Sequence, residues 1–161
     1  MNKKQPTAYL ICGFIGAGKT TFARKLEKET GAVRITKDEW MITVFGNKIT
    51  SDKNFEEYDK NVIELSRNLA FKILESGGDV IMDEGFWAKS ERNDLIKKIL
   101  NIGAKPILYF VDCPIEEMRK RVLSRSDNPP IDSFEINGEM FDSYVKYWEP
   151  PTEDEEFILV K

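Results

Sequence analysis

The chain contains no histidine, only two cysteines and no long apolar run. The absence of histidine excludes imidazole bases and imidazole metal ligands. Any catalytic base must therefore be a carboxylate, a lysine, a tyrosine or water. The two cysteines, Cys12 and Cys113, lack the spacing of a metal site. Each ends a predicted strand, and this position favours a small, buried structural role.

Membrane and nucleic-acid contacts are also poorly supported. No apolar run approaches the roughly 20 residues that cross a bilayer, and residues 1–6 carry charge without the apolar segment of a signal peptide. We therefore expect a cytoplasmic protein without membrane contact. The net charge is −4 and no basic tract is present, and both features argue against a nucleic-acid partner. The length of 161 residues predicts a single domain over residues 1–161.

A glycine-rich stretch is the strongest signal that the chain does contain. It matches the P-loop pattern Gly-x-x-x-x-Gly-Lys-Thr in full, as Gly13-Phe14-Ile15-Gly16-Ala17-Gly18-Lys19-Thr20, followed by Thr21. Such a loop directs several backbone N–H groups into one concavity that suits a polyphosphate. Lys19 is expected to reach the terminal phosphates and the Thr20 hydroxyl to ligate Mg²⁺. The stretch thus predicts ATP and Mg²⁺ as cofactors, although it does not separate ATP from GTP.

The segments around the P-loop predict an α/β fold. Apolar strands alternate with amphipathic helices along the whole chain, which indicates a parallel sheet covered by helices on both faces. The predicted strands are 8–12, 32–35, 80–82, 106–111 and 157–160, and the predicted helices are 20–29, 41–45, 55–75, 91–102, one starting at 114, and 137–148.

Three acidic residues follow predicted strands, where ligands bind in open parallel sheets. Asp83 suits a Walker B acid that helps hold Mg²⁺ near Thr20, or else a helix cap. Asp38 is a candidate general base for an acceptor hydroxyl, or else the N-cap of the next helix. Glu84 stays open as an alternative base. Trp40, Phe86, Trp87 and Arg92 complete the candidates for acceptor binding, although the aromatic rings are equally consistent with a core role.

The arginines before the Pro129-Pro130 loop form a further candidate group. Arginines on a mobile lid neutralise charge on a transferring phosphoryl group. Arg121 and Arg125 are four residues apart and share a helix face, which favours a lid role for these two. For the trio that includes Arg119, a solvated helix face is favoured instead.

Together these motifs resemble P-loop kinases of the group that includes chloramphenicol phosphotransferase, zeta toxins and the kinase domain of polynucleotide kinase. The matching segments are 13–20, 36–40 with Asp38, 80–83, and 112–114 leading to Arg121 and Arg125. Small bacterial ATP-binding proteins of this group are similar also at 82–87 and 149–152. The resemblance implies a three-layer, nucleoside-kinase-like P-loop fold with five strands in the order 2-3-1-4-5. It also implies a lid around residues 119–133 and Asp38 as the catalytic carboxylate.

The function expected from this resemblance is transfer of the γ-phosphate of Mg-ATP to a hydroxyl of a small molecule. In this reaction Lys19, Asp38, Arg121 and Arg125 are the catalytic candidates. Two alternatives stay open: a nucleotide-binding ATPase or switch without such an acceptor, and a nucleic-acid 5′-hydroxyl kinase. The lack of a basic path weakens the last of these. The acceptor and the oligomeric state are not set by the sequence.

Overall fold

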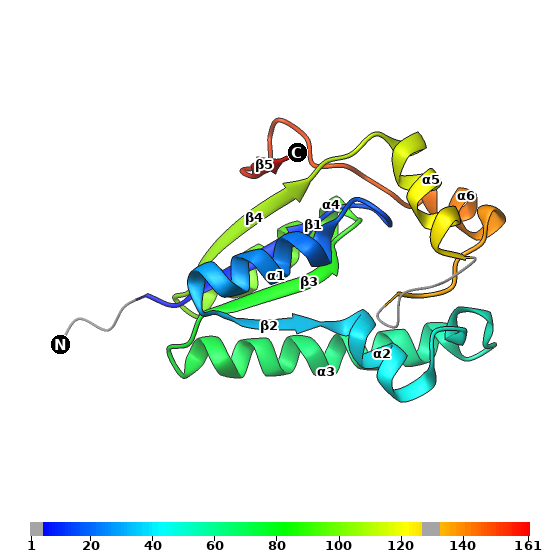
Figure 1. The fold of residues 1–161 in the computed structure, drawn as a ribbon. Coiled ribbons are helices and arrows are strands. Elements are labelled where there is room, and N and C mark those ends of the chain that lie inside the picture. The colour runs from blue at the N-terminus through cyan, green and yellow to red at the C-terminus, as the bar shows by residue number, and fades with distance from the viewer. Residues whose placement is uncertain (1–4, 127–132) are drawn as a thin grey trace.

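The computed structural model describes residues 5–126 and 133–161. Its centre is a parallel five-stranded sheet in the order β2-β3-β1-β4-β5, as Figure 1 shows. The predicted fold class and strand order are therefore confirmed. The strands are β1 (Thr7–Cys12), β2 (Val33–Thr36), β3 (Val80–Gly85), β4 (Lys105–Val111) and β5 (Ile158–Val160).

Helices cover both faces of this sheet. They are α1 (Lys19–Thr30), α2 (Lys37–Phe45), α3 (Phe55–Glu75), α4 (Lys89–Asn101), α5 (Ile115–Ser126) and α6 (Gly138–Val145), with a short 3₁₀ turn, η1 (Ile49–Ser51). Successive side chains of β1 point to opposite faces. Leu10 joins a core beneath α3 and α4, whereas Ile11 joins a core beneath α1, α5 and α6. Within the described residues, no helix is both long and apolar enough to cross a bilayer.

Helix α3 has the predicted bounds but a different buried face. The apolar periodicity of the sequence predicts that Leu65 and Leu69 point inward, but in the structure they are 61% and 40% exposed. The buried stripe instead contains Ser66, Ala70 and Leu74. Two small side chains in this stripe let the helix lie close to the sheet, and the longer leucines are displaced to its flank. The apolar periodicity indicated the helix correctly but placed its buried face about one residue out of phase.

Strand β3 continues three residues beyond its predicted end at Met82. Asp83 and Glu84 therefore belong to the strand itself, and Gly85 closes it with a backbone φ of 94°. Phe86 follows with a φ of 47°, a left-handed conformation that costs free energy in a residue with a Cβ atom. The carbonyl of Gly85 accepts a hydrogen bond from the N–H of Gly13 at 3.1 Å. This sharp turn thereby ties the end of β3 to the P-loop.

Candidate active site

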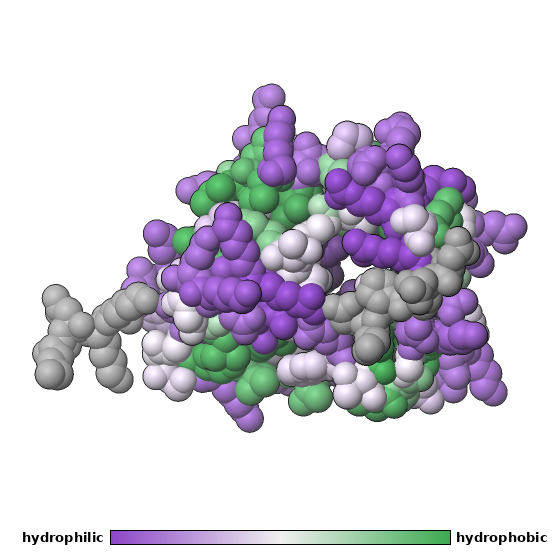
Figure 2. Space-filling model, viewed as in Figure 1, coloured by the Kyte–Doolittle hydropathy of each residue, from purple (hydrophilic) through white to green (hydrophobic). Residues whose placement is uncertain are grey.

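A cavity of 540 Å³ opens at the carboxyl ends of the strands. Figure 2 shows the molecule hollowed here, between the side of α1 and α2 and the side of α5. One part of its lining, the P-loop end, consists of Gly16, Gly18, Lys19, Thr20 and Arg125. A second part of the lining, the carboxylate end, consists of Lys37, Asp38, Asp59, Glu84 and Glu91.

The P-loop end depends on glycine because the backbone passes very close to its neighbours. A Cβ atom added at Gly16 would lie 2.7 Å from the carbonyl oxygen of Met118, and one at Gly13 would lie 2.9 Å from that of Val111. Gly18 is left-handed, with a φ of 101°, and precedes α1 without a side-chain cap. The first N–H groups of α1 thus need an outside partner, and an anion is a suitable one.

Lys19 lies at the start of α1 and lines the cavity. Its ammonium donates a hydrogen bond to the carbonyl of Phe14 at 2.9 Å, within the loop itself. Burial lowers the pKa of Lys19 from its usual value, and the negative charges of Asp83 and Asp38 oppose this effect. A buried cation that is only partly compensated by carboxylates is suited to an incoming phosphate.

Thr20 and Asp83 meet beside Lys19. The Thr20 hydroxyl donates to Asp83 Oδ2 at 2.8 Å, and the Thr36 hydroxyl approaches the same oxygen at 3.4 Å. Burial raises the pKa of Asp83, while the Lys19 charge and the Thr20 hydrogen bond lower it. One carboxylate and one hydroxyl fit Mg²⁺, which prefers oxygen ligands and takes the rest from phosphates and water. Among the described residues, no group of three Asp, Glu, Cys or His side chains is placed to hold a metal without such help.

Asp38 is the second residue of α2, and Thr36 occupies the N-cap position. The alternative interpretation of Asp38 as an N-cap is therefore wrong. Its side chain is 44% exposed, yet the Oδ1 atom is buried and has no hydrogen-bond partner. Lys37 Nζ lies 3.0 Å from that oxygen, as an ion pair without hydrogen-bond geometry. The structure thus presents the half-exposed Asp38 side chain to the cavity, with its buried Oδ1 held by the Lys37 charge.

Lys37 also reaches across to α3. Its ammonium donates to Asp59 Oδ1 at 2.5 Å. Burial lowers the pKa of Lys37, but Asp38 and Asp59 together outweigh this effect and raise it above the usual value. Lys37 is therefore a permanent cation between two carboxylates.

Glu84 is the most buried acid of the carboxylate end, with a side chain only 2% exposed. Arg67 of α3 donates to Glu84 Oε2 through Nε at 2.9 Å and through Nη2 at 2.7 Å. The same Nη2 also binds Glu91 Oε1 of α4. Burial raises the pKa of Glu84, and Arg67 acts in the opposite direction. Glu84 is thus paired and enclosed, whereas the Asp38 side chain is paired but 44% exposed.

The predicted aromatic residues take different places. Phe86 and Trp87 line the cavity, and the Trp87 ring packs against Phe14 at a centroid distance of 4.9 Å and against Tyr144 at 5.9 Å. Trp40 instead packs against the core beneath α3 and α4 and is not part of the cavity lining.

The structure does not bring Arg92 to the cavity. Its side chain is fully buried, and Nη1 donates to the carbonyls of Phe86 at 2.9 Å, Trp87 at 3.1 Å and Glu149 at 2.9 Å. Nε and Nη2 bind the carboxylate of Glu155 at 2.7 and 2.8 Å. The guanidinium therefore joins the turn after β3 to the C-terminal segment, and its predicted contact with an acceptor does not fit this position.

The arginines of α5 point in two directions. Arg121 Nη1 lies 3.4 Å from the Gly16 carbonyl, and its Nε donates to Glu117 at 3.1 Å. Arg125 lines the P-loop end, whereas Arg119 turns away and pairs with Asp142 of α6 at 2.9 Å. The expected lid continues through residues 127–132, including Pro129 and Pro130, and these lie outside the described residues.

Sequence reasoning missed Lys37, Asp59, Arg67 and Glu91. Asp59 and Arg67 belong to α3, whose distance from the P-loop cannot be read from the chain. The one available signal was spacing, since Asp59 and Ile63 are four residues apart on α3 and both line the cavity.

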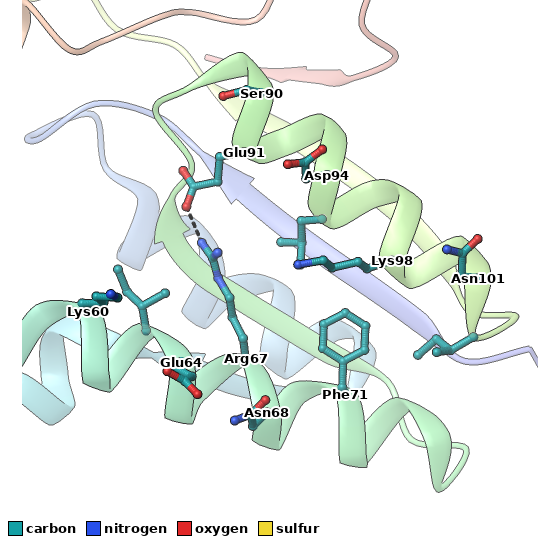
Figure 3. Close-up of a pocket in the computed structure, with 13 residues that line it drawn as sticks. Lys60, Glu64, Arg67, Asn68, Phe71, Ser90, Glu91, Asp94, Lys98 and Asn101 are labelled. Carbon is teal, nitrogen blue, oxygen red and sulfur yellow. Dashed lines mark hydrogen bonds and ion pairs between the residues drawn. The ribbon is translucent and has the colours of Figure 1, made fainter.

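A second cavity, of 880 Å³, lies between α3 and α4 (Figure 3). Arg67, Phe71, Asp94 and Lys98 are among its lining residues. Ile63 and Glu91 line both cavities, which makes the two neighbours.

A family model for an AAA domain, AAA_33, matches residues 9–151. The chain belongs to this family. With the P-loop and the strand order, this establishes a P-loop kinase-like, ATP-binding fold.

The relatives of this chain include proteins named as kinases. UMP-CMP kinase 3 of Arabidopsis thaliana is 24% identical over 148 residues, which are 89% of this chain and 73% of the relative. A shikimate kinase of Caldicellulosiruptor saccharolyticus is 27% identical over 128 residues, which are 74% of this chain and 66% of the relative.

Solved structures share the fold at lower identity. Chaetomium thermophilum Kti12 in complex with ADP-AlF3 has a TM-score of 0.71 and 20% identity, over 95% of this chain and 88% of that one. A chain of the Pnkp1/Rnl/Hen1 RNA repair complex has a TM-score of 0.71 and 22% identity, over 91% of this chain and 45% of that one.

Proposed function

We propose that this chain acts as a single domain that transfers the γ-phosphate of ATP to a hydroxyl of a small molecule. The observation that carries the proposal is one 540 Å³ cavity whose lining contains both the P-loop and the half-exposed carboxylate of Asp38. A volume of this size suits a small ligand. The relatives' names, UMP-CMP kinase and shikimate kinase, support phosphotransfer. They imply two different acceptors, a nucleoside monophosphate and a carboxylic acid, and so leave the acceptor open.

The nucleotide is assigned to the P-loop end. The N–H groups of residues 13–20 hold the phosphates, and Lys19 moves from the Phe14 carbonyl to the γ-phosphate. Thr20 and Asp83 are placed to hold Mg²⁺, which when bound neutralises charge on the phosphates. The complex of Kti12 with ADP-AlF3 supports a nucleotide in this position.

Asp38 is assigned as the base. As the acceptor oxygen forms its bond to the γ-phosphorus and the bond to the leaving ADP oxygen breaks, Asp38 takes the hydroxyl proton. Lys37 keeps the carboxylate in place through its contact at 3.0 Å. Glu84 is less suited to this role because its side chain is only 2% exposed and Arg67 binds its Oε2.

Arg121 and Arg125 are assigned to the phosphates, as the part of the lid within α5.

An acceptor screen by ADP formation, over sugars, nucleosides and antibiotics, tests the whole proposal. Turnover that rises strongly with one acceptor class supports it. A slow rate that no acceptor changes would favour the ATPase alternative.

Replacing Lys19 with alanine is expected to weaken Mg-ATP binding by about 10- to 100-fold, the range for lost hydrogen bonds to charged groups. Calorimetry on the folded variant measures this. Lys25→Ala is the matched control, because Lys25 also lies on α1 but is 71% exposed and makes only a surface pair with Glu29. Equal affinities for the wild type and Lys19→Ala would contradict the site.

Arg121→Ala and Arg125→Ala are each expected to lower turnover by about 10- to 100-fold, for the same physical reason. Arg119→Ala serves as the control on the same helix, since Arg119 pairs with Asp142 and points away from the P-loop. A steady-state assay at saturating acceptor compares the three. If all three variants turn over at the wild-type rate, this face of α5 is only a solvated surface and the lid assignment fails.

A further inference from the structure

The cations of the carboxylate end are already bound by the protein. Lys37 lies between Asp38 at 3.0 Å and Asp59 at 2.5 Å. An anionic group of a ligand would have to compete with both carboxylates for the charge of Lys37. Displacing either of them would leave a carboxylate without its partner in a partly buried place, which is unfavourable.

Arg67 repeats the arrangement behind the first pair. In Figure 3 its side chain extends from α3 toward Glu91 of α4, and its other contact is Glu84. The Phe86 ring lies near the same guanidinium, with 5.8 Å between Cζ and the ring centroid. Two carboxylates and one aromatic face therefore surround Arg67, as two carboxylates flank Lys37.

The carboxylate end consequently has an excess of negative charge. Asp38, Asp59, Glu84 and Glu91 face two cations, Lys37 and Arg67. A further cation of the lining, Arg24, binds Glu39 at 2.9 Å. A cationic group would thus find carboxylates in excess, whereas an anionic group would meet like charge.

We infer that the acceptor is a hydroxylated molecule without a carboxylate or phosphate group, and that an amino group close to its reactive hydroxyl strengthens binding. The inference rests on the proposed kinase function and specifies its substrate class. The ammonium group stays protonated and pairs with Asp59 and Glu91. The neighbouring hydroxyl oxygen attacks the γ-phosphorus, its proton passes to Asp38, and ADP leaves with the electrons of the broken phosphorus–oxygen bond.

A set of hydroxylated acceptors with cationic, neutral and anionic members tests this inference. We would measure kcat/KM by ADP formation at saturating Mg-ATP for glucosamine, glucose and gluconate, for cytidine and CMP, and for shikimate. The amino member should exceed the neutral one, and the neutral members the anionic ones, each by about tenfold or more, the step that a modest charge interaction produces. Equal or faster reaction of the anionic members overturns the inference and leaves the kinase proposal standing. No reaction with any member, while ATP still binds, overturns both.

Charge variants separate this effect from shape. Asp59→Asn keeps the size of the side chain but removes one negative charge beside Lys37. It should reduce the preference for the amino over the anionic member by about tenfold. Glu64→Gln is the matched control, because Glu64 lies on the same helix and lines only the α3–α4 cavity. An unchanged preference in folded Asp59→Asn, or an equal change in Glu64→Gln, overturns the role of the carboxylate end.

Discussion

Asp38→Asn is expected to lower acceptor phosphorylation by about 10²–10⁴-fold, the usual contribution of a general base. Asparagine keeps the size of the side chain but cannot take a proton, and it cannot form the ion pair with Lys37 seen at 3.0 Å. Nucleotide affinity should change little, because the P-loop end is built from other residues. Rapid-quench or steady-state assays with an accepted substrate measure the first quantity, and calorimetry the second.

The basal hydrolysis of ATP should fall less than transfer, since water can attack without Asp38. Asp112→Asn is the matched control, because Asp112 also follows a strand but is exposed and is not part of the cavity lining. Near-normal transfer in folded Asp38→Asn would contradict the assignment and direct attention to Glu84.

Arg92→Met is expected to lower the free energy of unfolding by about 3–5 kcal/mol, as expected when one partner of a buried ion pair is removed. Methionine retains much of the volume but none of the five donors. Glu155 would keep a nearly buried charge, and the carbonyls of Phe86, Trp87 and Glu149 would lose a shared donor. Urea unfolding followed by circular dichroism measures the change.

Two comparisons make this prediction specific. Arg119→Met removes an exposed pair and should leave the free energy of unfolding nearly unchanged. Hydrogen bonding to Arg92 lowers the pKa of Glu155 in the folded protein. The stabilisation is therefore present above the usual glutamate pKa of about 4.3 and is lost as the pH falls through the folded value. The difference in the free energy of unfolding between wild type and Arg92→Met should shrink in acid. A small difference at neutral pH would refute the stabilising role of Arg92.

The sequence predicted the fold and the P-loop end because these depend on local patterns. A run such as residues 13–20 between an apolar strand and a helix has one well-known structural solution. Asp83 and Asp38 were found by the same reasoning, because the carboxyl ends of parallel strands lie at one edge of the sheet.

The carboxylate end could not be predicted in this way. Lys37, Asp59 and Arg67 act through contacts between α2, α3 and the end of β3, and the rotation of α3 depends on small residues such as Ser66 and Ala70. Arg92 shows the opposite error. Arg92 was predicted to contact the acceptor. Its buried position instead depends on Glu155, a partner 63 residues away along the chain that local patterns do not reveal.

The two ends of the cavity come from separate stretches of the chain. The P-loop end is built from α1, its preceding loop and α5, whereas the carboxylate end is built from α2, α3, the end of β3 and the start of α4. Under the proposed assignment, mutations in α3 can alter the accepted molecule without altering the residues that hold ATP. The substrate can then change through α3 while the P-loop end and Asp38 keep the chemistry of phosphoryl transfer.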